Sequence, residues 1–395
     1  MKSLAVSNGI ICDMSGRSVF LRGVNLGGWL MLEGYILGGR NIPEHQFKKT
    51  LQARSSRISV QSFYRRFRKS FITGNDFARI KQLGLTCVRI PFHYRLIHDR
   101  THAGIHLLDT AIAYCNRLGL YVILDMHAAP GSQNADWHSD SSGRAQFWEH
   151  AAHRQHAVRL WRFLSRRYRK TPAIAGYDLI NEPVTRKTAH INRFYNDTIR
   201  MLRQDGDNRL IFLEGNRWAQ DIDFIKPWST DNIVLSIHYY LPLEYTFNLE
   251  MGSAYPGVIN RQEWNKKRLI KTLAGYVTIQ QRLKLPVYVG EFGINTRCYA
   301  CAHELKILDD MLAVFKHYGW HWTYWTYKTI ALGIFPNGIL QYLKNPEWVN
   351  RQGPECGWET YSRIPQTKQK ALFDGFTTRH FVKHAGVARL LRTYQ

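Results

Sequence analysis

Eight short segments of the chain are almost continuously apolar, and stretches with a helical spacing of apolar residues separate most of them. A strand that is buried on both faces of a parallel sheet has this continuous apolar pattern. The predicted strands are residues 19–25, 87–92, 121–127, 176–182, 210–215, 233–240, 287–292 and 322–328. The predicted helices are residues 77–83, 107–118, 145–168, 191–205, 263–282 and 304–318. Strands that alternate with helices in this way predict an α/β fold, a (β/α)8 TIM barrel with long loop insertions.

The connections that follow three of the predicted strands are much longer than a usual loop. They span residues 35–73, 128–146 and 241–262. Loops after the strands of a TIM barrel lie on the face that carries the active site, so these insertions are expected to shape a cleft. We predict a single catalytic domain over residues 1–395, with a barrel core at about 18–330 and a C-terminal extension, 331–395, that packs on the barrel or is appended to it. Residues 3–12 and 17–23 are predicted to pair as strands joined at 13–16.

Two of the predicted strands end on a glutamate, at Glu182 and Glu291. Catalytic residues of a TIM barrel lie where a strand meets its following loop, so both carboxyl groups are expected to face one cleft. Retaining glycoside hydrolysis requires two carboxyl groups roughly 5 Å apart, one as acid/base and one as nucleophile. The other strand ends carry further polar or aromatic side chains, which are Arg89, His127, Asn181, His238, Tyr240 and Trp325.

Short motifs surround these strand ends. They are Arg-Ile-Pro at 89–91, Asp-Met-His at 125–127, Asn-Glu-Pro at 181–183, His-Tyr-Tyr at 238–240, Gly-Glu-Phe at 290–292 and the tryptophan at 325. The set resembles glycoside hydrolase family 5, the large cellulase-like group of retaining β-glycosidases, over about Gly23 to Trp325. Within that family, residues 23–33, 129–134 and 324–328 are most similar to exo-β-1,3-glucanases.

The resemblance implies a role for each residue of the catalytic centre. Glu182 is the implied general acid/base, with a pKa that burial and the charge of its partner raise. Glu291 is the implied nucleophile, which forms the glycosyl–enzyme intermediate. Arg89 is expected to hold Glu291 ionised through a charge-assisted hydrogen bond. Tyr240 is expected to donate to the same carboxylate, and His238 to tune the pair.

The resemblance also implies sugar-binding roles. Asn181 is expected to bind the 2-hydroxyl, where a hydrogen bond strengthens in the transition state, and His127 the region of the 3-hydroxyl. Trp325 is the implied platform beneath the reacting sugar, and Glu33 the implied binder of non-reducing-end hydroxyls, which favours exo action. Further subsite candidates are Asn25, Tyr35, Phe92, His93, Trp137 and Trp218. The mechanism requires no metal and no cofactor, and the chain carries no zinc-protease, phosphate-loop or dinucleotide motif.

The resulting hypothesis is a retaining β-glycosidase that hydrolyses β-glucans or β-glucosides by double displacement from chain ends, as β-1,3-glucanases and β-glucosidases do. An endo-β-1,4-glucanase and a non-catalytic carbohydrate-binding barrel are the alternatives. Loss of either glutamate would favour the binding barrel, and both are present. The expected partner is a carbohydrate substrate.

The chain is strongly basic, with a formal net charge of +24. No recognised nucleic-acid motif accompanies this charge, so no nucleic-acid partner is expected. The basic residues between 162 and 170 fall in a helical pattern and are interpreted as a solvated helix face, and another basic cluster occupies 65–69. Attraction to an acidic polymer or to a membrane surface stays open. The charge suits a small β-glucoside, a glycolipid or an acidic glycan better than an external wall polymer as the substrate.

The cysteines and the N-terminal residues bear on the compartment. Cys87 and Cys115 lie in apolar segments and are predicted to be buried free thiols. Cys298 and Cys301 form half of a zinc motif, and two unlinked loop thiols are favoured over a redox pair. The first residues are too polar for a secretory signal, and no apolar stretch reaches the ~18 residues of a membrane span. A cytoplasmic location is expected.

Overall fold

The computed structural model describes residues 1–54, 59–98, 103–250, 252–296, 302–330, 333–342 and 366–394. Eight parallel strands close into a barrel, in agreement with the predicted TIM barrel. They are β3 (Arg22–Asn25), β4 (Cys87–His93), β5 (Tyr121–Ala128), β6 (Ile174–Asp178), β7 (Leu210–Glu214), β8 (Ile233–His238), β11 (Val287–Phe292) and β12 (His321–Tyr324). Several predicted strands extend too far: β6 ends four residues before Glu182, β8 ends two residues before Tyr240, and β12 ends before Trp325.

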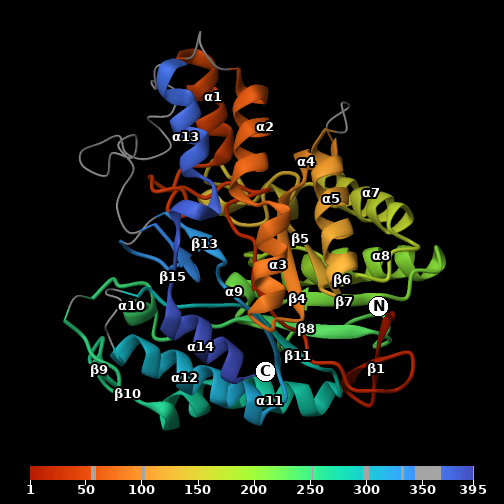
Figure 1. The fold of residues 1–395 in the computed structure, drawn as a ribbon. Coiled ribbons are helices and arrows are strands. Elements are labelled where there is room, and N and C mark those ends of the chain that lie inside the picture. The colour runs from red at the N-terminus through yellow and green to blue at the C-terminus, as the bar shows by residue number, and fades with distance from the viewer. Residues whose placement is uncertain are drawn as a thin grey trace.

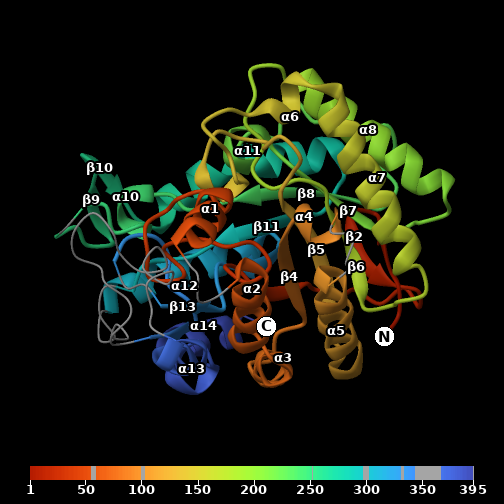
Figure 2. The same ribbon diagram turned by 90° about the horizontal axis from the view of Figure 1, so that it is seen from above.

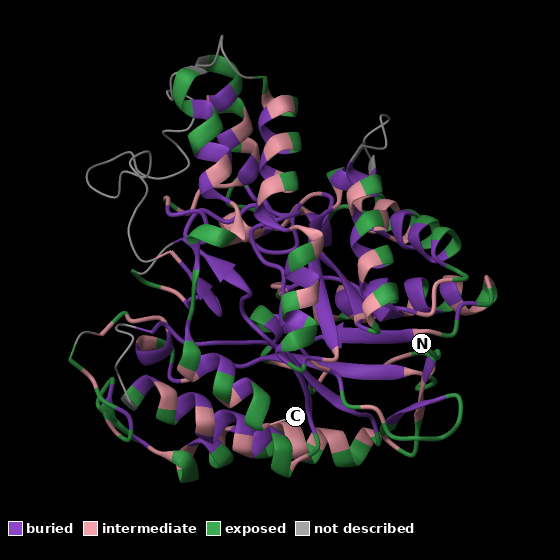
Figure 3. Ribbon diagram, in the orientation of Figure 1, coloured by how far each residue is buried: buried purple, intermediate pink, exposed green. Residues whose placement is uncertain are grey.

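Helices surround the barrel, as Figures 1 and 2 show from two directions. They include α3 (Gly74–Gln82), α5 (Ala103–Leu118), α7 (Ala151–Arg167), α8 (Thr188–Gln204), α11 (Lys266–Leu283) and α12 (Ala302–His317). In α8 the buried side chains recur every three or four residues, which places one apolar face against the sheet. Figure 3 shows the consequence: the strands are buried, and the helices are exposed on their outer faces.

The insertion after β3 and the C-terminal residues pack against each other. Helices α1 (Glu44–Arg54), α2 (Val60–Phe71) and α13 (Gln369–Gly375) stand together at the top of Figure 1. Phe63 contacts the rings of Phe47 and Phe373, and Arg66 donates to Gln369 across 3.2 Å. Strand β15 (Val382–Lys383) pairs with β14 (Leu340–Gln341), and α14 (Ala385–Thr393) contacts α12. The described part of the C-terminal extension therefore packs on the barrel.

The N-terminal strand pair differs from the prediction. Strand β1 (Leu4–Ser7) pairs with β2 (Ile10–Asp13), and the turn lies at Asn8-Gly9. Both turn residues have positive φ, the geometry that makes Asn-Gly the strongest hairpin signal. The turn at 13–16 does form, but only a single bridge, Cys12 to Ser18, follows it.

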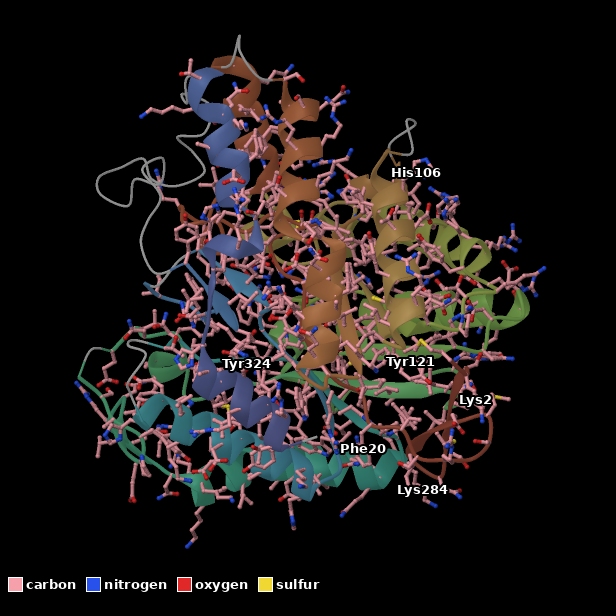
Figure 4. The ribbon with its side chains drawn as sticks, viewed as in Figure 1. Lys2, Phe20, His106, Tyr121, Lys284 and Tyr324 are labelled. Carbon is pink, nitrogen blue, oxygen red and sulfur yellow. The ribbon has the colours of Figure 1, made fainter. Side chains whose placement is uncertain are left out.

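This hairpin covers the end of the barrel where the strands begin. The hydroxyl of Tyr121, at the start of β5, donates to the Lys2 carbonyl across 3.0 Å. Figure 4 places Lys2, Tyr121, Phe20 and Lys284 toward this end of the molecule, whereas His106 of α5 lies toward the other. The candidate site is at the opposite end, where the strands finish.

The structure also bears on the cysteines and on membrane-spanning helices. Cys87 and Cys115 are buried free thiols, as predicted. Cys298 and Cys301 lie outside the described residues. Among the helices of the described part of the chain, none is long and apolar enough to cross a bilayer.

Candidate active site

A cleft of about 450 Å³ opens at the carboxyl ends of the barrel strands. This volume falls within the range of small-molecule sites. Its lining contains Glu182, Glu291, His127, His238, Tyr240, Trp325 and Glu33 among the predicted site residues, together with Tyr35, Trp137, His138, Trp218 and Phe335. Arg89 and Asn181 lie beneath it and are fully buried. The structure thus brings every predicted catalytic and supporting residue to one place.

Glu182 and Glu291 face each other across the cleft. One carboxyl oxygen of each lies within 4.8 Å of the other and of a His238 nitrogen. Glu182 has a φ of +48°, an uncommon value for a side-chain-bearing residue. Its N–H donates to Glu214 across 2.6 Å, and its carbonyl accepts from Asn134 across 2.9 Å. These two bonds hold the backbone in the conformation that directs the Glu182 side chain into the cleft.

Glu291 accepts one hydrogen bond at each carboxyl oxygen. Nη1 of Arg89 donates to Oε1 across 2.8 Å, and the hydroxyl of Tyr240 donates to Oε2 across 2.9 Å. Both contacts agree with the prediction. Arg89 is the centre of a buried network, because its guanidinium also pairs with three further carboxylates, Asp125 at 3.1 Å, Asp178 at 2.9 Å and Glu214 at 2.9 Å.

The protonation of Glu182 differs from the prediction. Burial acts to raise its pKa, but hydrogen bonds from His138 and His238 outweigh burial and hold the pKa well below its usual range. Nε2 of His138 lies 3.0 Å from Oε2, and Nδ1 of His238 lies 2.7 Å from Oε1. Although burial opposes their charge, nearby carboxylates raise the pKa of both imidazoles. These contacts favour an ionised Glu182 beside protonated imidazole, whereas the sequence predicted a protonated Glu182.

The predicted sugar-binding residues lie in the lining of the cleft or, for Asn181, buried beneath it. Oδ1 of Asn181 accepts from Arg89 across 2.9 Å, whereas its Nδ2 has no hydrogen-bond partner in the described part of the chain. Nδ1 of His127 lies 2.7 Å from Asp125, and its ring stacks on Trp325 with centroids 5.4 Å apart. Burial, then the charge of Glu291, raises the pKa of Glu33 well above its usual range, so its carboxyl can donate as well as accept.

Three of the six further subsite candidates lie elsewhere. Asn25 is inside the barrel, where its amide donates to the Gly290 carbonyl and its oxygen accepts from Arg89. Phe92 packs against Trp161 in the core. His93 lies on the far side of the cleft wall, with Nε2 2.9 Å from Asp140. Asn25 is the last residue of β3, and the other two are the last residues of β4, but none of the three side chains lines the cleft.

The other three candidates, Tyr35, Trp137 and Trp218, do line the cleft. Trp218 is 42% exposed, and its indole N–H donates to Asp136 across 2.7 Å. It lies within Arg217–Ala219, where three consecutive residues have φ between +53° and +59°. Left-handed conformations cost free energy for residues with a side chain and concentrate at functional sites. The strained segment presents the Trp218 ring at the mouth of the cleft.

The sequence interpretation missed four residues of this site. Glu214 ends an apolar strand and so satisfies the same rule that identified Glu182 and Glu291. Asp125 and Asp178 are carboxylates inside otherwise apolar strands, which is a signal for a buried ion network. His138 lies in the short 3-10 helix Trp137–Ser139, within the insertion after β5, and its sequence context gives no comparable signal. Loop placement of this kind depends on tertiary contacts.

One set of three side chains in the described residues has donor atoms close enough to hold a metal ion: Glu182, His238 and Glu291. All three already hydrogen-bond to one another or to neighbours, and Arg89 supplies a fixed positive charge beside Glu291. The absence of a metal requirement stays a prediction.

Comparisons with known proteins agree with this geometry. A profile of cellulase (glycosyl hydrolase family 5) matches residues 48–329. A β-xylosidase of Phanerodontia chrysosporium is 32% identical to this chain, and the match covers 84% of this chain and 72% of the xylosidase. A probable glucan 1,3-β-glucosidase A of Aspergillus fumigatus is 25% identical, and the match covers 86% of this chain and 92% of the glucosidase. The endoglucanase Cel5A of Thermotoga maritima superposes with a TM-score of 0.58 at 18% identity, covering 79% of this chain and 91% of its own, which shows a shared fold.

Proposed function

The chain belongs to glycosyl hydrolase family 5, and we propose that it cleaves β-glycosidic bonds with retention of configuration through Glu291 as nucleophile and Glu182 as general acid/base. The observation that carries this proposal is the separation of the two carboxyl groups. Their nearest oxygens lie within 4.8 Å. Retaining enzymes hold the pair roughly 5–5.5 Å apart, whereas inverting enzymes leave about 6.5–9.5 Å for a water molecule.

In the first step, Glu291 attacks the anomeric carbon, the bond from that carbon to the leaving oxygen breaks, and Glu182 delivers a proton to that oxygen. Because His138 and His238 hold the available protons in the free cleft, one of them must return a proton to Glu182 when the substrate displaces its hydrogen bond. In the second step, Glu182 removes a proton from water, which attacks the anomeric carbon and releases Glu291.

Other residues of the cleft have supporting roles in this proposal. Arg89 and Tyr240 orient the Glu291 carboxylate for attack. The unpartnered amide of Asn181 donates to the sugar 2-hydroxyl, where the bond strengthens as the transition state forms. Trp325 forms the platform beneath the sugar, and its indole N–H donates to the Tyr35 hydroxyl, which fixes the ring.

For the substrate, we propose a β-glucoside or β-1,3-glucan that is attacked from its non-reducing end. Buried Glu33 supports this, because its carboxyl can bind terminal hydroxyls. A chain of neighbouring aromatic rings supports a closed end to the cleft. Successive rings have centroids 4.9 to 6.2 Å apart, in the order Tyr35, Trp137, Phe335 and Phe247. The names of two relatives, a β-xylosidase and a probable glucan 1,3-β-glucosidase A, support this choice.

The test is a substrate panel of aryl β-glucoside, aryl β-xyloside, laminarin, a soluble cellulose derivative and glucosylceramide. Glucose as the first product from laminarin would support exo action on β-1,3 bonds. Cleavage of the cellulose derivative with a rapid fall in viscosity would instead identify an endo-β-1,4-glucanase.

Two variants assign the chemistry. Glu291→Gln should reduce turnover at least ~10³-fold, the scale on which catalytic nucleophiles matter. Glu149→Gln, at an exposed carboxylate that pairs with Arg144, is the matched control and should keep wild-type turnover. Full activity in Glu291→Gln would refute the nucleophile assignment, and no activity of the wild-type protein on any substrate would favour a binding barrel.

A further inference from the structure

A second cavity, of about 890 Å³, lies outside the catalytic cleft. Helices α1, α2, α5 and α7 and the segment after β4 contribute to its wall. Its lining includes five lysine and arginine side chains, Lys48, Arg65, Arg68, Lys69 and Arg95. His106, labelled in Figure 4, marks where α5 reaches it. The volume is within the range of ligand sites, and nothing in the proposed hydrolysis uses it.

The cations of this cavity differ in their partners. Lys48 pairs with Glu44 at 2.7 Å, and Arg95 pairs with Asp140 at 2.6 Å. On α7, Arg162 and Arg166 both pair with Asp205 at 2.7 and 3.0 Å. This confirms the solvated helix face predicted for that basic cluster. By contrast, Arg65 and Lys69 have no acidic partner anywhere in the described part of the chain. The cavity therefore keeps an excess of positive charge.

The buried carboxylate of Glu44, in the wall of this cavity, indicates that the local electrostatic potential is positive. Glu44 is completely buried and lies 2.7 Å from the ammonium of Lys48. Burial alone would raise its pKa, yet the charges of Lys48, His93 and Arg68 lower the pKa to about 2. Negative charge is thus favoured at the wall of the cavity even where water is excluded.

The cavity also offers apolar and aromatic surface. Val60, Leu96 and Leu107 line it together with Tyr64 and Tyr94. The Lys48 ammonium and the Arg68 guanidinium lie 4.9 and 4.8 Å from the centroid of the Tyr64 ring. Sugar rings bind to surfaces that combine apolar faces with hydrogen-bond donors, and arginine side chains bind carboxylate and phosphate with paired donors.

A thin wall separates this cavity from the catalytic cleft. The N–H of Leu32 donates to Glu44 across 3.0 Å, and the next residue, Glu33, faces the cleft. His93, in the cavity lining, contacts Asp140, which lies two residues from the His138 that contacts Glu182. The two sites are neighbours on the same face of the barrel.

We propose that this cavity is a second carbohydrate site, which binds an acidic saccharide, that is, a sugar carrying carboxylate or phosphate groups. The excess of cations selects the acidic group, and the aromatic and apolar lining binds the ring. In this proposal the basic cluster at 65–69 binds the acidic group of the saccharide, whereas the proposed hydrolysis assigns it no role.

The test is isothermal titration of the full chain at constant ionic strength with four probes: glucose 6-phosphate, glucuronate, glucose and inorganic phosphate. Both acidic sugars should bind at least 10-fold more tightly than either glucose or inorganic phosphate. Inorganic phosphate that bound as tightly as glucose 6-phosphate would overturn the saccharide assignment, and the absence of binding by both acidic sugars would overturn the site.

Variants locate the binding. The double variant Arg65→Ala/Lys69→Ala should weaken both acidic sugars at least 10-fold, and both positions are exposed, so the thermal midpoint should not move. The control Arg162→Ala/Arg166→Ala removes the same charge from α7 and should bind like the wild type. Equal weakening in both would show attraction by overall charge alone and refute the site. Titration requires no turnover, so this result is independent of whether the proposed hydrolysis is correct.

Discussion

Replacement of His138 by glutamine should shift the pH dependence of catalysis. Nε2 of His138 lies 3.0 Å from both Oε2 of Glu182 and the amide nitrogen of Asn134. When it carries a proton it donates to Glu182, and when it does not it accepts from Asn134. The carboxylate is the stronger of these two partners. Glutamine can place an amide donor in nearly the same position, but it cannot carry the proton. The variant therefore removes one of the residues that can store the proton needed by the leaving group.

The sign follows from where the proton is held. In the wild type, the Glu182 charge raises the pKa of His138 above its ordinary value of 6.5, so the pair keeps its proton to higher pH than Glu182 alone would. A charge-assisted hydrogen bond of this kind contributes roughly 1.5–3 kcal/mol, and one pKa unit corresponds to about 1.4 kcal/mol. We expect the basic limb of kcat/KM to move roughly 1–2 units toward lower pH in His138→Gln.

The assay is kcat/KM for an aryl β-glucoside from pH 4 to pH 10. His150→Gln, at an exposed histidine outside the cleft, is the matched control and should leave the profile unchanged. His238 remains in the variant and still contacts Glu182, so activity at the optimum should persist. An unchanged basic limb in His138→Gln, or a shift toward higher pH, would refute the reasoning.

The remaining predictions concern stability and substrate binding. Arg89→Lys should lower the free energy of unfolding by roughly 3–5 kcal/mol in urea titrations, because one ammonium cannot bond to the four buried carboxylates around it; an unchanged midpoint would contradict this. Burial lowers the pKa of Lys328 to about 7, whereas an unfolded lysine keeps its proton to about pH 10.4. The free energy of unfolding should therefore rise between pH 7 and pH 10, because the unfolded chain binds a proton that the folded chain has lost. In Lys328→Met, thermal midpoints measured across this pH range should increase less than in the wild type. Trp218→Ala should raise KM for aryl glucosides roughly 2- to 10-fold, because it removes one aromatic contact with the substrate, and the thermal midpoint should not change. An unchanged KM would show that the Trp218 ring does not bind the substrate.

Much of the barrel could be predicted because each strand is buried on both faces and is therefore continuously apolar. The catalytic pair could be predicted for a related reason, since Glu182 and Glu291 each interrupt an apolar run, Glu291 near the end of β11 and Glu182 four residues after β6. The N-terminal hairpin was mispredicted because two turn signals compete, at Asn8-Gly9 and at 13–16. The Asn-Gly turn has the twist that two paired strands require, and it determined the pairing.

The protonation of the site could not be predicted, because it depends on a loop far from both glutamates in the sequence. Asp140 has a φ of +57° and contacts His45, His93 and Arg95 at 2.6 to 2.9 Å. These contacts fix the loop that carries His138 against Glu182. The expectation of a raised pKa counted burial and one neighbouring carboxylate, whereas two imidazoles determine the result.

The central claim is a double displacement at Glu291, and the configuration of the first product tests it most directly. Proton NMR of the anomeric signals, recorded within minutes of adding enzyme to an aryl β-glucoside, distinguishes the initial anomer before mutarotation. We expect the β-anomer to form first, because two inversions restore the configuration. Initial release of the α-anomer would show a single inversion and contradict the assignment of Glu291 as nucleophile.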